Sequence, residues 1–168
     1  YGIFDEKGIS FDNRDGLPLT VKGQLPGGRY ALPGDVSSQF FTGLLFALPL
    51  AGDDSVLIST TTLESKSYVD MTLDTLARHG ITIHEKSPEH YEIPGGQSYK
   101  AGAFAVEGDY SQAAFWLVSG LTGAGITLQG LFLDSKQGDK AILTILSKMG
   151  GDIREENGMI AAKPSKTR

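Results

Sequence analysis

The chain has 168 residues, of which 40% are hydrophobic and 21% are charged, with a formal net charge of −5 and no cysteine. These values indicate one ordinary globular domain or two small ones, and they exclude a disulfide framework, a thiolate metal site and a cysteine nucleophile. Apolar runs are too short for a membrane span, and Lys and Arg form no stripe, so we expect neither a membrane nor a nucleic-acid partner. No secretory leader opens the chain, and a cytoplasmic location is expected.

Residues 1–22 have the pattern of the end of an earlier folding unit. Two short strands are predicted there, at Phe4 to Lys7 and at Ile9 to Phe11, with no helix before them. We interpret this segment as the tail of a preceding repeat. The chain is therefore expected to begin partway through a larger architecture.

Residues 23–106 alternate between strand and helix patterns. Strands are predicted at 29–32, 55–59, 81–84 and 90–93, with a polar turn at 86–89. One helix is expected after an N-cap at Asp35, and a second runs from Ser65 to a stop at Gly80. Their apolar faces are Phe41, Leu44, Leu45 and Leu48 in the first helix, and Val69, Leu73 and Leu76 in the second.

Residues 107–168 repeat this order. After a predicted strand at 104–106, the segment Gly108 to Ser111 repeats the Gly-Asp-x-Ser pattern of Gly34 to Ser37. A helix with Phe115, Val118 and Leu121 on its apolar face follows, then a strand at 126–129, a helix with Leu143 and Leu146, and a hairpin closed by Asn157-Gly158. We infer an internal repeat and an α+β fold of two similar modules, with a boundary between 102 and 108.

Hydroxyl groups are concentrated at the two helix openings of the first module. Ser37, Ser38 and Gln39 stand at one opening, and Ser65 and Tyr68 at the other. Free backbone N–H groups and the helix dipole favour an anion at such a place. The matching openings of the second module, 111–113 and 137–139, have fewer hydroxyls. Since the fold constrains both copies alike, the excess favours a bound anion, with ordinary helix capping as the alternative.

Other chemistries find little support in the residues. The histidines, His79, His84 and His90, lack a metal-ligand spacing, and we expect no metal site. The sequence contains neither a Gly-x-Ser-x-Gly nucleophile elbow nor a phosphate-binding loop that ends in Gly-Lys-Ser/Thr. The glycines at 120–125 follow a helix, so we interpret them as a helix stop rather than as a dinucleotide loop.

Several segments, taken in order, resemble the 5-enolpyruvylshikimate-3-phosphate synthase family from about Leu17 to Ala162. They are Gly34 to Phe40, Leu63 to Asp70, Val106 to Asp109, Gln137 to Asp139, and Lys148 to Gly150. The resemblance implies βαβαββ repeats of the enolpyruvyl transferase type, an inside-out α/β barrel or α-β prism, with three repeats in each of two domains. It also implies transfer of the enolpyruvyl group of phosphoenolpyruvate to the 5-hydroxyl of shikimate 3-phosphate, with release of phosphate and without a cofactor.

The resemblance assigns the hydroxyl-rich openings to substrate. It places Ser37 and Ser38 at the 3-phosphate of shikimate 3-phosphate, and Gln39 against shikimate on the phosphoenolpyruvate side. Ser65 and Tyr68 complete the phosphate site. Ser67 departs from the family, which usually has proline there, and the first turn of that helix loses a preset φ angle.

The family's cationic phosphoenolpyruvate site and its acidic residues for proton transfer have no counterpart in this chain. The resemblance therefore implies that the chain holds no catalytic residue and needs the remaining segments of a parent polypeptide. It assigns 1–22 to a preceding repeat, 23–106 to the last repeat of the first domain, and 107–168 to one repeat of the second. The alternatives are a piece of the related UDP-N-acetylglucosamine enolpyruvyl transferase, a noncatalytic phosphometabolite-binding module and a purely structural domain.

Overall fold

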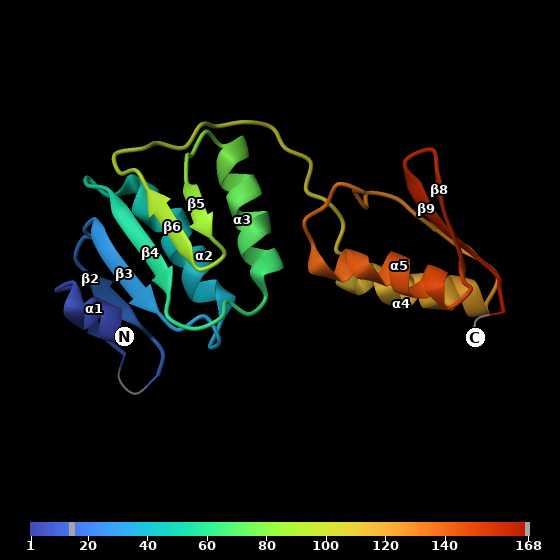
Figure 1. Cartoon of the computed structure of the whole chain (residues 1–168), viewed down its shortest axis with the longest axis horizontal. Coiled ribbons are helices and arrows are strands. Elements are labelled where there is room, and N and C mark those ends of the chain that lie inside the picture. Colours follow the sequence, from blue (N-terminus) through green and yellow to red (C-terminus); the bar gives the residue numbers. More distant parts are fainter. Residues whose placement is uncertain (14–15, 167–168) are drawn as a thin grey trace. The chain divides into compact units, whose positions relative to one another are not determined.

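The computed structural model describes residues 1–13 and 16–166. They form two compact units, 1–102 and 103–168, which we describe separately as unit 1 and unit 2. The fold is mixed α/β, and the described residues form three open sheets rather than a closed barrel (Figure 1). Within these residues, no helix combines the length and the apolar character that crossing a membrane requires.

Unit 1 begins with a short helix and a two-stranded ribbon. Helix α1 spans Gly2–Glu6, and strands β1 (Ser10–Asp12) and β2 (Thr20–Lys22) pair antiparallel. The strand predicted at Phe4 to Lys7 is therefore wrong. A helical turn places Tyr1 and Phe4 on the same side, where both rings contact Phe11 at centroid distances of 4.6 and 5.9 Å. Alternation along a strand would have pointed the two rings to opposite faces.

The main sheet of unit 1 has the predicted strand–helix–strand–helix–strand–strand order. Its elements are β3 (Gly28–Leu32), α2 (Ser38–Ala47), the 3-10 turn η1 (Leu48–Leu50), β4 (Ser55–Ser59), α3 (Lys66–Arg78), β5 (His84–Ser87) and β6 (His90–Ile93). The spatial order is β3-β4-β6-β5, with β3 and β4 parallel and the other pairs antiparallel.

The predicted apolar faces of both helices are confirmed as core. Phe41, Leu45 and Leu48 are buried together with Val69 and Leu76. The sheet contributes its own buried side chains to this core, namely Tyr30, Leu32, Leu57, Tyr91 and Ile93. Burial of each such side chain contributes about 1.5–3 kcal/mol relative to exposure, so this core fixes α2 and α3 on the sheet.

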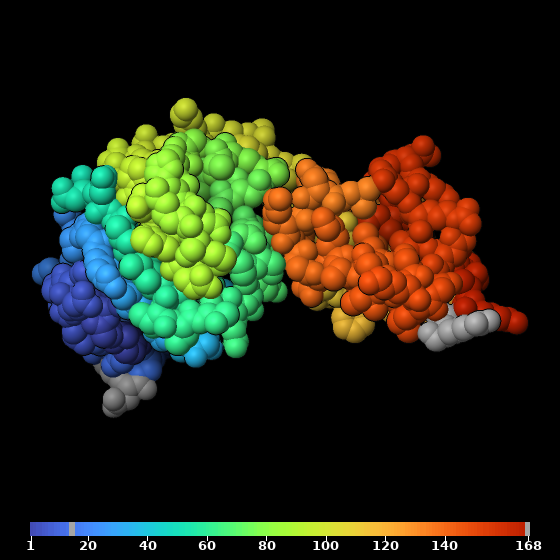
Figure 2. All heavy atoms as spheres, viewed as in Figure 1, coloured from blue at the N-terminus to red at the C-terminus, as the bar shows by residue number. Residues whose placement is uncertain are grey.

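The third predicted strand, Ile81 to His84, is displaced along the chain. The structure has β5 at His84–Ser87, and the turn before β6 is confined to 88–89. The Ile81 amide donates to Leu76 O at 3.0 Å, which holds this segment at the end of α3. The backbone of Thr82 bonds to the side chain of Gln97 rather than to a strand. The β5–β6 hairpin, yellow-green in Figure 2, forms part of the surface of unit 1.

From its first helix onward, unit 2 has the connectivity that unit 1 has after strand β3. Its elements are α4 (Tyr110–Thr122), β7 (Ile126–Leu128), the 3-10 turn η2 (Gly138–Lys140), α5 (Ala141–Lys148), β8 (Asp152–Glu156) and β9 (Met159–Lys163). Strand β9 lies between β7 and β8 and is antiparallel to both, as β6 lies between β4 and β5. The predicted hairpin turn is confirmed, with positive φ angles of 54° at Asn157 and 73° at Gly158.

The strand predicted at 104–106 is absent from the structure. Residues 103–109 have no regular structure, and Val106 is 95% exposed. A strand needs a neighbour to satisfy its backbone, and this segment lies beside none of the described strands. Its end is held at Gly108, whose amide donates to Gly130 O at 2.7 Å and whose carbonyl oxygen accepts from Gln137 Nε2 at 2.9 Å.

The buried face of α4 also differs from the prediction. Leu121 is buried as expected, but Phe115 is 74% exposed and Val118 is exposed too. The face that packs on the sheet contains small residues: a Cβ on Gly120 would lie 2.5 Å from Ile126 Cγ2 and 3.0 Å from Ala162 Cβ. The helix approaches the sheet through this face because only small side chains allow so short a distance. The buried α4 residues are Tyr110, Ala113, Leu117, Gly120 and Leu121.

Candidate anion-binding site

The two hydroxyl-rich openings of unit 1 lie at one edge of its sheet. Strands β3 and β4 are adjacent and parallel, with Leu32 opposite Ser59 at their carboxyl ends (Figure 1). The loops after these strands lead directly into α2 and α3. In open α/β sheets this edge is where ligands bind. The Glu64 amide donates to Gly34 O at 3.1 Å, so the two loops are also joined to each other.

At Gly34 the two loops are packed closely together. Gly34 is buried, and a Cβ there would lie 2.2 Å from Ser59 Oγ and 2.8 Å from Leu63 Cα. Any side chain at this position would push the loops apart. The glycine of the Gly-Asp-x-Ser pattern is therefore required by the distance between the α2 and α3 openings.

Helix α2 begins two residues later than the sequence predicts. Its N-cap is Ser37, whose Oγ accepts from the Gln39 amide at 3.2 Å. The predicted N-cap, Asp35, instead accepts a hydrogen bond from Thr61 Oγ1 at 3.0 Å. Ser37 and Ser38 are half-buried and Gln39 is exposed. The three predicted ligand residues of this opening thus occupy the N-cap and the first turn.

The α3 opening presents its two predicted ligand residues differently. Ser65 occupies the N-cap position as predicted, but its φ of 55° is left-handed and its side chain makes no capping hydrogen bond. Tyr68 is 53% exposed in the first turn, and its amide donates to Ser65 O at 3.0 Å. Both side chains therefore lie at the surface of the same sheet edge as the α2 opening.

The cation nearest to these residues in the sequence is already paired. Lys66 Nζ contacts Asp70 and lies 3.0 Å from Glu85 Oε1 of β5. Burial alone would lower the pKa of Lys66, but its hydrogen bonds to the two carboxylates outweigh burial and raise it. An anion at the two openings would consequently meet hydroxyl and N–H donors, while the charge of Lys66 is neutralised by its neighbours.

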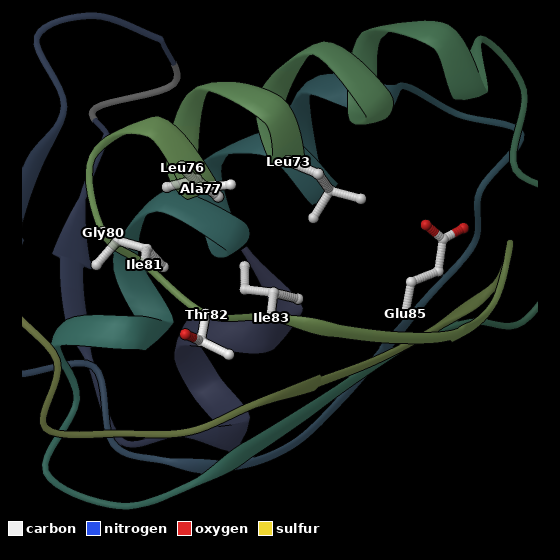
Figure 3. Close-up of a pocket in the computed structure, with 8 residues that line it drawn as sticks. All are labelled: Leu73, Leu76, Ala77, Gly80, Ile81, Thr82, Ile83 and Glu85. Atoms are coloured by element: carbon white, nitrogen blue, oxygen red, sulfur yellow. The ribbon is translucent and has the colours of Figure 1, made fainter.

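A pocket of about 520 Å³ lies elsewhere in unit 1, between α3 and the segment that precedes and enters β5. Figure 3 shows Leu73 and Ile83 at this pocket, with Glu85 at one end. The lining residues are Leu73, Leu76, Ala77, Gly80, Ile81, Thr82, Ile83 and Glu85. Its largely apolar wall contains none of the predicted ligand residues and is unsuited to a phosphate.

The matching opening of unit 2 is occupied by its own side chains. Asp109 caps α4, with its Oδ1 accepting from the Ser111 amide at 2.8 Å and from Ser111 Oγ at 2.7 Å. Hydrogen bonds from the Ser111 hydroxyl and amide hold the pKa of Asp109 below its ordinary value. The Gln137 side chain accepts from the Tyr110 amide at 2.8 Å and donates to Gly108 O at 2.9 Å.

Comparison with known proteins assigns the chain to a family. The profile of EPSP synthase (3-phosphoshikimate 1-carboxyvinyltransferase) matches residues 4–168. The chain belongs to the EPSP synthase family. It is 51% identical over 168 residues to the 3-phosphoshikimate 1-carboxyvinyltransferase of Clostridium kluyveri, covering 99% of this chain and 39% of the relative. The corresponding protein of Clostridium acetobutylicum is 48% identical over 159 residues, with 94% and 37% coverage.

Solved structures of this fold agree with the family. The EPSP synthase of Acinetobacter baumannii superimposes with a TM-score of 0.68 at 21% identity, over 96% of this chain and 37% of the other. The enolpyruvyl transferase NikO of Streptomyces tendae gives a TM-score of 0.73 at 16% identity, over 97% and 41%. The enolpyruvyl transferase fold expected from the sequence is thus confirmed. The chain spans about 39% of the length of its clostridial relative.

Thr61 also lies at this edge, although the sequence pattern did not predict a role for it. It lies in the Thr60-Thr61-Thr62 run between β4 and α3, and its hydroxyl bonds to the loop before α2. A run of threonines before a helix opening is an available signal, but the pattern alone does not indicate which hydroxyl reaches the neighbouring loop. The roles of Ser37, Ser38, Gln39, Ser65 and Tyr68 as ligands stay predictions.

Proposed function

We propose that this chain is part of an enolpyruvyl transferase and supplies part of its site for shikimate 3-phosphate. The whole enzyme transfers the enolpyruvyl group of phosphoenolpyruvate to the 5-hydroxyl of shikimate 3-phosphate and releases phosphate. One observation carries the proposal: in a member of the EPSP synthase family, the hydroxyl-rich openings of α2 and α3 lie at the same sheet edge.

Each predicted ligand residue has a role in this proposal. Ser37 and Ser38 donate to the 3-phosphate at the start of α2, Gln39 contacts the shikimate ring, and Ser65 and Tyr68 complete the phosphate site from α3. The 3-phosphate does not react. Its binding energy orients the 5-hydroxyl for the reaction, because binding of remote groups of a substrate can pay for positioning at the reacting centre.

The remaining segments of a longer polypeptide supply what this edge lacks. A phosphate dianion is bound best by charge-assisted hydrogen bonds, and Lys66 is committed to two carboxylates. Cationic groups and the acid–base groups of the reaction are therefore assigned to the parts of the enzyme beyond the 39% that this chain covers. The chain by itself should bind weakly and turn over no substrate.

The repeat assignments belong to the same proposal. Residues 1–22 are the tail of a preceding repeat, 23–106 the last repeat of the first domain, and 107–168 one repeat of the second. A cytoplasmic location stays part of this proposal as well, and fractionation of the source cells tests it.

An NMR titration with shikimate 3-phosphate tests the proposed binding. In the wild-type chain, the amide signals of 37–39 and 65–68 should shift together in the millimolar range. Ser37→Ala with Ser38→Ala should abolish these shifts. Ser111→Ala changes the matching serine of unit 2 and should leave them unchanged. Shifts that are absent from the wild-type chain, or insensitive to the double substitution, would contradict the proposed site.

Two further outcomes would redirect the proposal. Submicromolar affinity of the chain alone for shikimate 3-phosphate would favour a noncatalytic phosphometabolite-binding module. Release of phosphate when the chain receives both substrates would contradict the assignment of the catalytic groups to other segments.

A further inference from the structure

The two Gly-Asp-x-Ser segments start their helices at different positions. In unit 2, Asp109 is the N-cap and α4 begins at Tyr110. In unit 1, the equivalent Asp35 lies outside the helix, Ser37 is the N-cap and α2 begins at Ser38. Similar sequences have therefore produced a charged cap in one unit and a neutral cap in the other.

Thr61 accounts for this difference. Its Oγ1 accepts from the Gly34 amide at 2.9 Å and from the Asp35 amide at 3.3 Å, and it donates to Asp35 Oδ1 at 3.0 Å. A hydroxyl has one proton to donate and two lone pairs, so this side chain uses its full hydrogen-bonding capacity on two residues. Ser59 Oγ donates to Thr61 O at 2.7 Å and fixes the backbone that carries Thr61.

In unit 2, the side chain that ties the neighbouring loop to the Gly-Asp-x-Ser segment hydrogen-bonds to backbone groups instead of to the aspartate carboxylate. Gln137 bonds to Gly108 O and to the Tyr110 amide, and the Asp109 carboxylate stays on the helix end. A carboxylate at a helix N-terminus takes the N–H groups that an incoming anion would use, and it repels that anion. A serine cap occupies one N–H group and adds no charge.

We propose that Thr61 is a positioning residue of the substrate-phosphate site: it holds the Asp35 carboxylate away from the start of α2, so that a neutral serine caps the helix and an anion can approach. This inference rests on the proposed function. It assigns the anion preference of unit 1 over unit 2 to a side chain of the neighbouring loop, in addition to the hydroxyls of the opening itself.

Ligand binding tests this role through a double-substitution cycle with Thr61→Val, Asp35→Asn and both together. Shikimate 3-phosphate should bind Thr61→Val roughly three- to tenfold more weakly, because the released carboxylate repels the phosphate. Asp35→Asn should bind at least as well as wild type, since asparagine still accepts from Thr61. The double variant should recover the wild-type affinity. If the double variant binds as weakly as Thr61→Val, then Thr61 only stabilises the loop and the proposal is overturned.

A second readout needs no ligand. In Thr61→Val, the backbone α-carbon shifts of 36 and 37 should move toward helical values, because the released Asp35 side chain can cap the helix and α2 can begin earlier. The wild-type chain, with Ser37 as its N-cap, should lack this change. Thr61→Val with wild-type α-carbon shifts at 36 and 37 would overturn the inference. If the wild-type chain fails to bind shikimate 3-phosphate, the proposed function fails and the position of the helix start still decides the inference.

Matched variants guard against a folding artefact. Thr61→Ser keeps the hydroxyl and should behave as wild type in both readouts. Thr61→Ala removes the hydroxyl without the bulk of valine and should reproduce Thr61→Val. Because Thr61 is exposed, both variants should fold. If Thr61→Ser instead behaved like Thr61→Val, this result would contradict the role assigned to the hydroxyl.

Discussion

The side-chain amide of Gln97 hydrogen-bonds both backbone groups of Thr82. Its Oε1 accepts from the Thr82 amide at 2.7 Å, and its Nε2 donates to Thr82 O at 2.9 Å. A side-chain carboxamide has the same donor and acceptor as a peptide group, so Gln97 takes the place of a neighbouring strand for this residue. The backbone of Thr82 is thereby satisfied without joining the sheet, and β5 starts only at His84.

Replacing Gln97 should loosen this part of unit 1. Gln97→Leu keeps the approximate side-chain size and removes both bonds to Thr82, at a cost of about 1 to 2 kcal/mol in the free energy of unfolding. The Thr82 amide should then exchange with solvent much faster in a hydrogen–deuterium experiment. Gln24→Leu, at an exposed position of the same unit, is the control. Unchanged exchange at Thr82 would show that water already competes for these groups.

Two glycines of unit 1 should respond in opposite directions to the same substitution. Gly34→Ala brings a methyl group within 2.2 Å of Ser59 Oγ, so it should destabilise the unit by about 1–3 kcal/mol. Gly43→Ala in α2 meets no atom within 4 Å and should stabilise it by about 0.5–1 kcal/mol through helix propensity. Urea denaturation of both variants measures the two values. If Gly34→Ala left the free energy of unfolding unchanged, the two loops would be able to separate without loss of stability.

Ionisation of Tyr91 limits the stability of unit 1 at high pH. Its buried hydroxyl donates to Pro88 O at 2.6 Å, and burial raises the pKa of Tyr91 to about 12. Because this pKa lies above the ordinary value of 10, the stability contributed by the neutral phenol is complete below pH 10 and is lost as the pH rises toward about 12. The stability advantage of wild type over Tyr91→Phe should shrink across that window in urea titrations. An advantage that stays constant would contradict the raised pKa.

Protonation of Asp109 limits the stability of unit 2 at low pH. Because its pKa is lowered by hydrogen bonds from Ser111, the charged cap stabilises the folded state above the ordinary carboxyl pKa. This contribution should disappear as the pH falls through the lowered value. The melting temperature of Asp109→Asn should therefore lie below that of wild type at pH 7 and approach it in acid. A gap that persists after the carboxylate is protonated would assign the effect to geometry instead of charge.

The order of elements in unit 1 could be predicted because each local signal agrees with the packing. Leu45 and Leu76 repeat with the helical period and are buried as that period requires. In α4 the same reasoning failed for Phe115. That helix is apolar on several sides, and the sheet selects the side with Gly120 and Ala113 because small residues allow close approach. Hydrophobic periodicity alone does not distinguish a large apolar face from a small one.

The candidate site was predictable to the level of its segments but not of its hydrogen bonds. Ser37 and Ser65 stand at helix starts as the capping pattern indicates. The exchange of Asp35 for Ser37 as N-cap depends on Thr61, which lies 26 residues away from Asp35 in the sequence. The local preference for Asp35 as N-cap gives way to its hydrogen bond with Thr61. This bond could be expected only once β3 and β4 are known to be neighbours in the sheet.

The outward face of α4 has a practical consequence. Trp116 is 58% exposed there, and it is the one tryptophan of the 168-residue sequence. Excitation of indole therefore reports on unit 2 alone, without labelling and without a contribution from the tyrosines of unit 1. A wavelength shift of this emission therefore signals burial of the α4 surface. The protein thus carries a built-in optical reporter of unit 2.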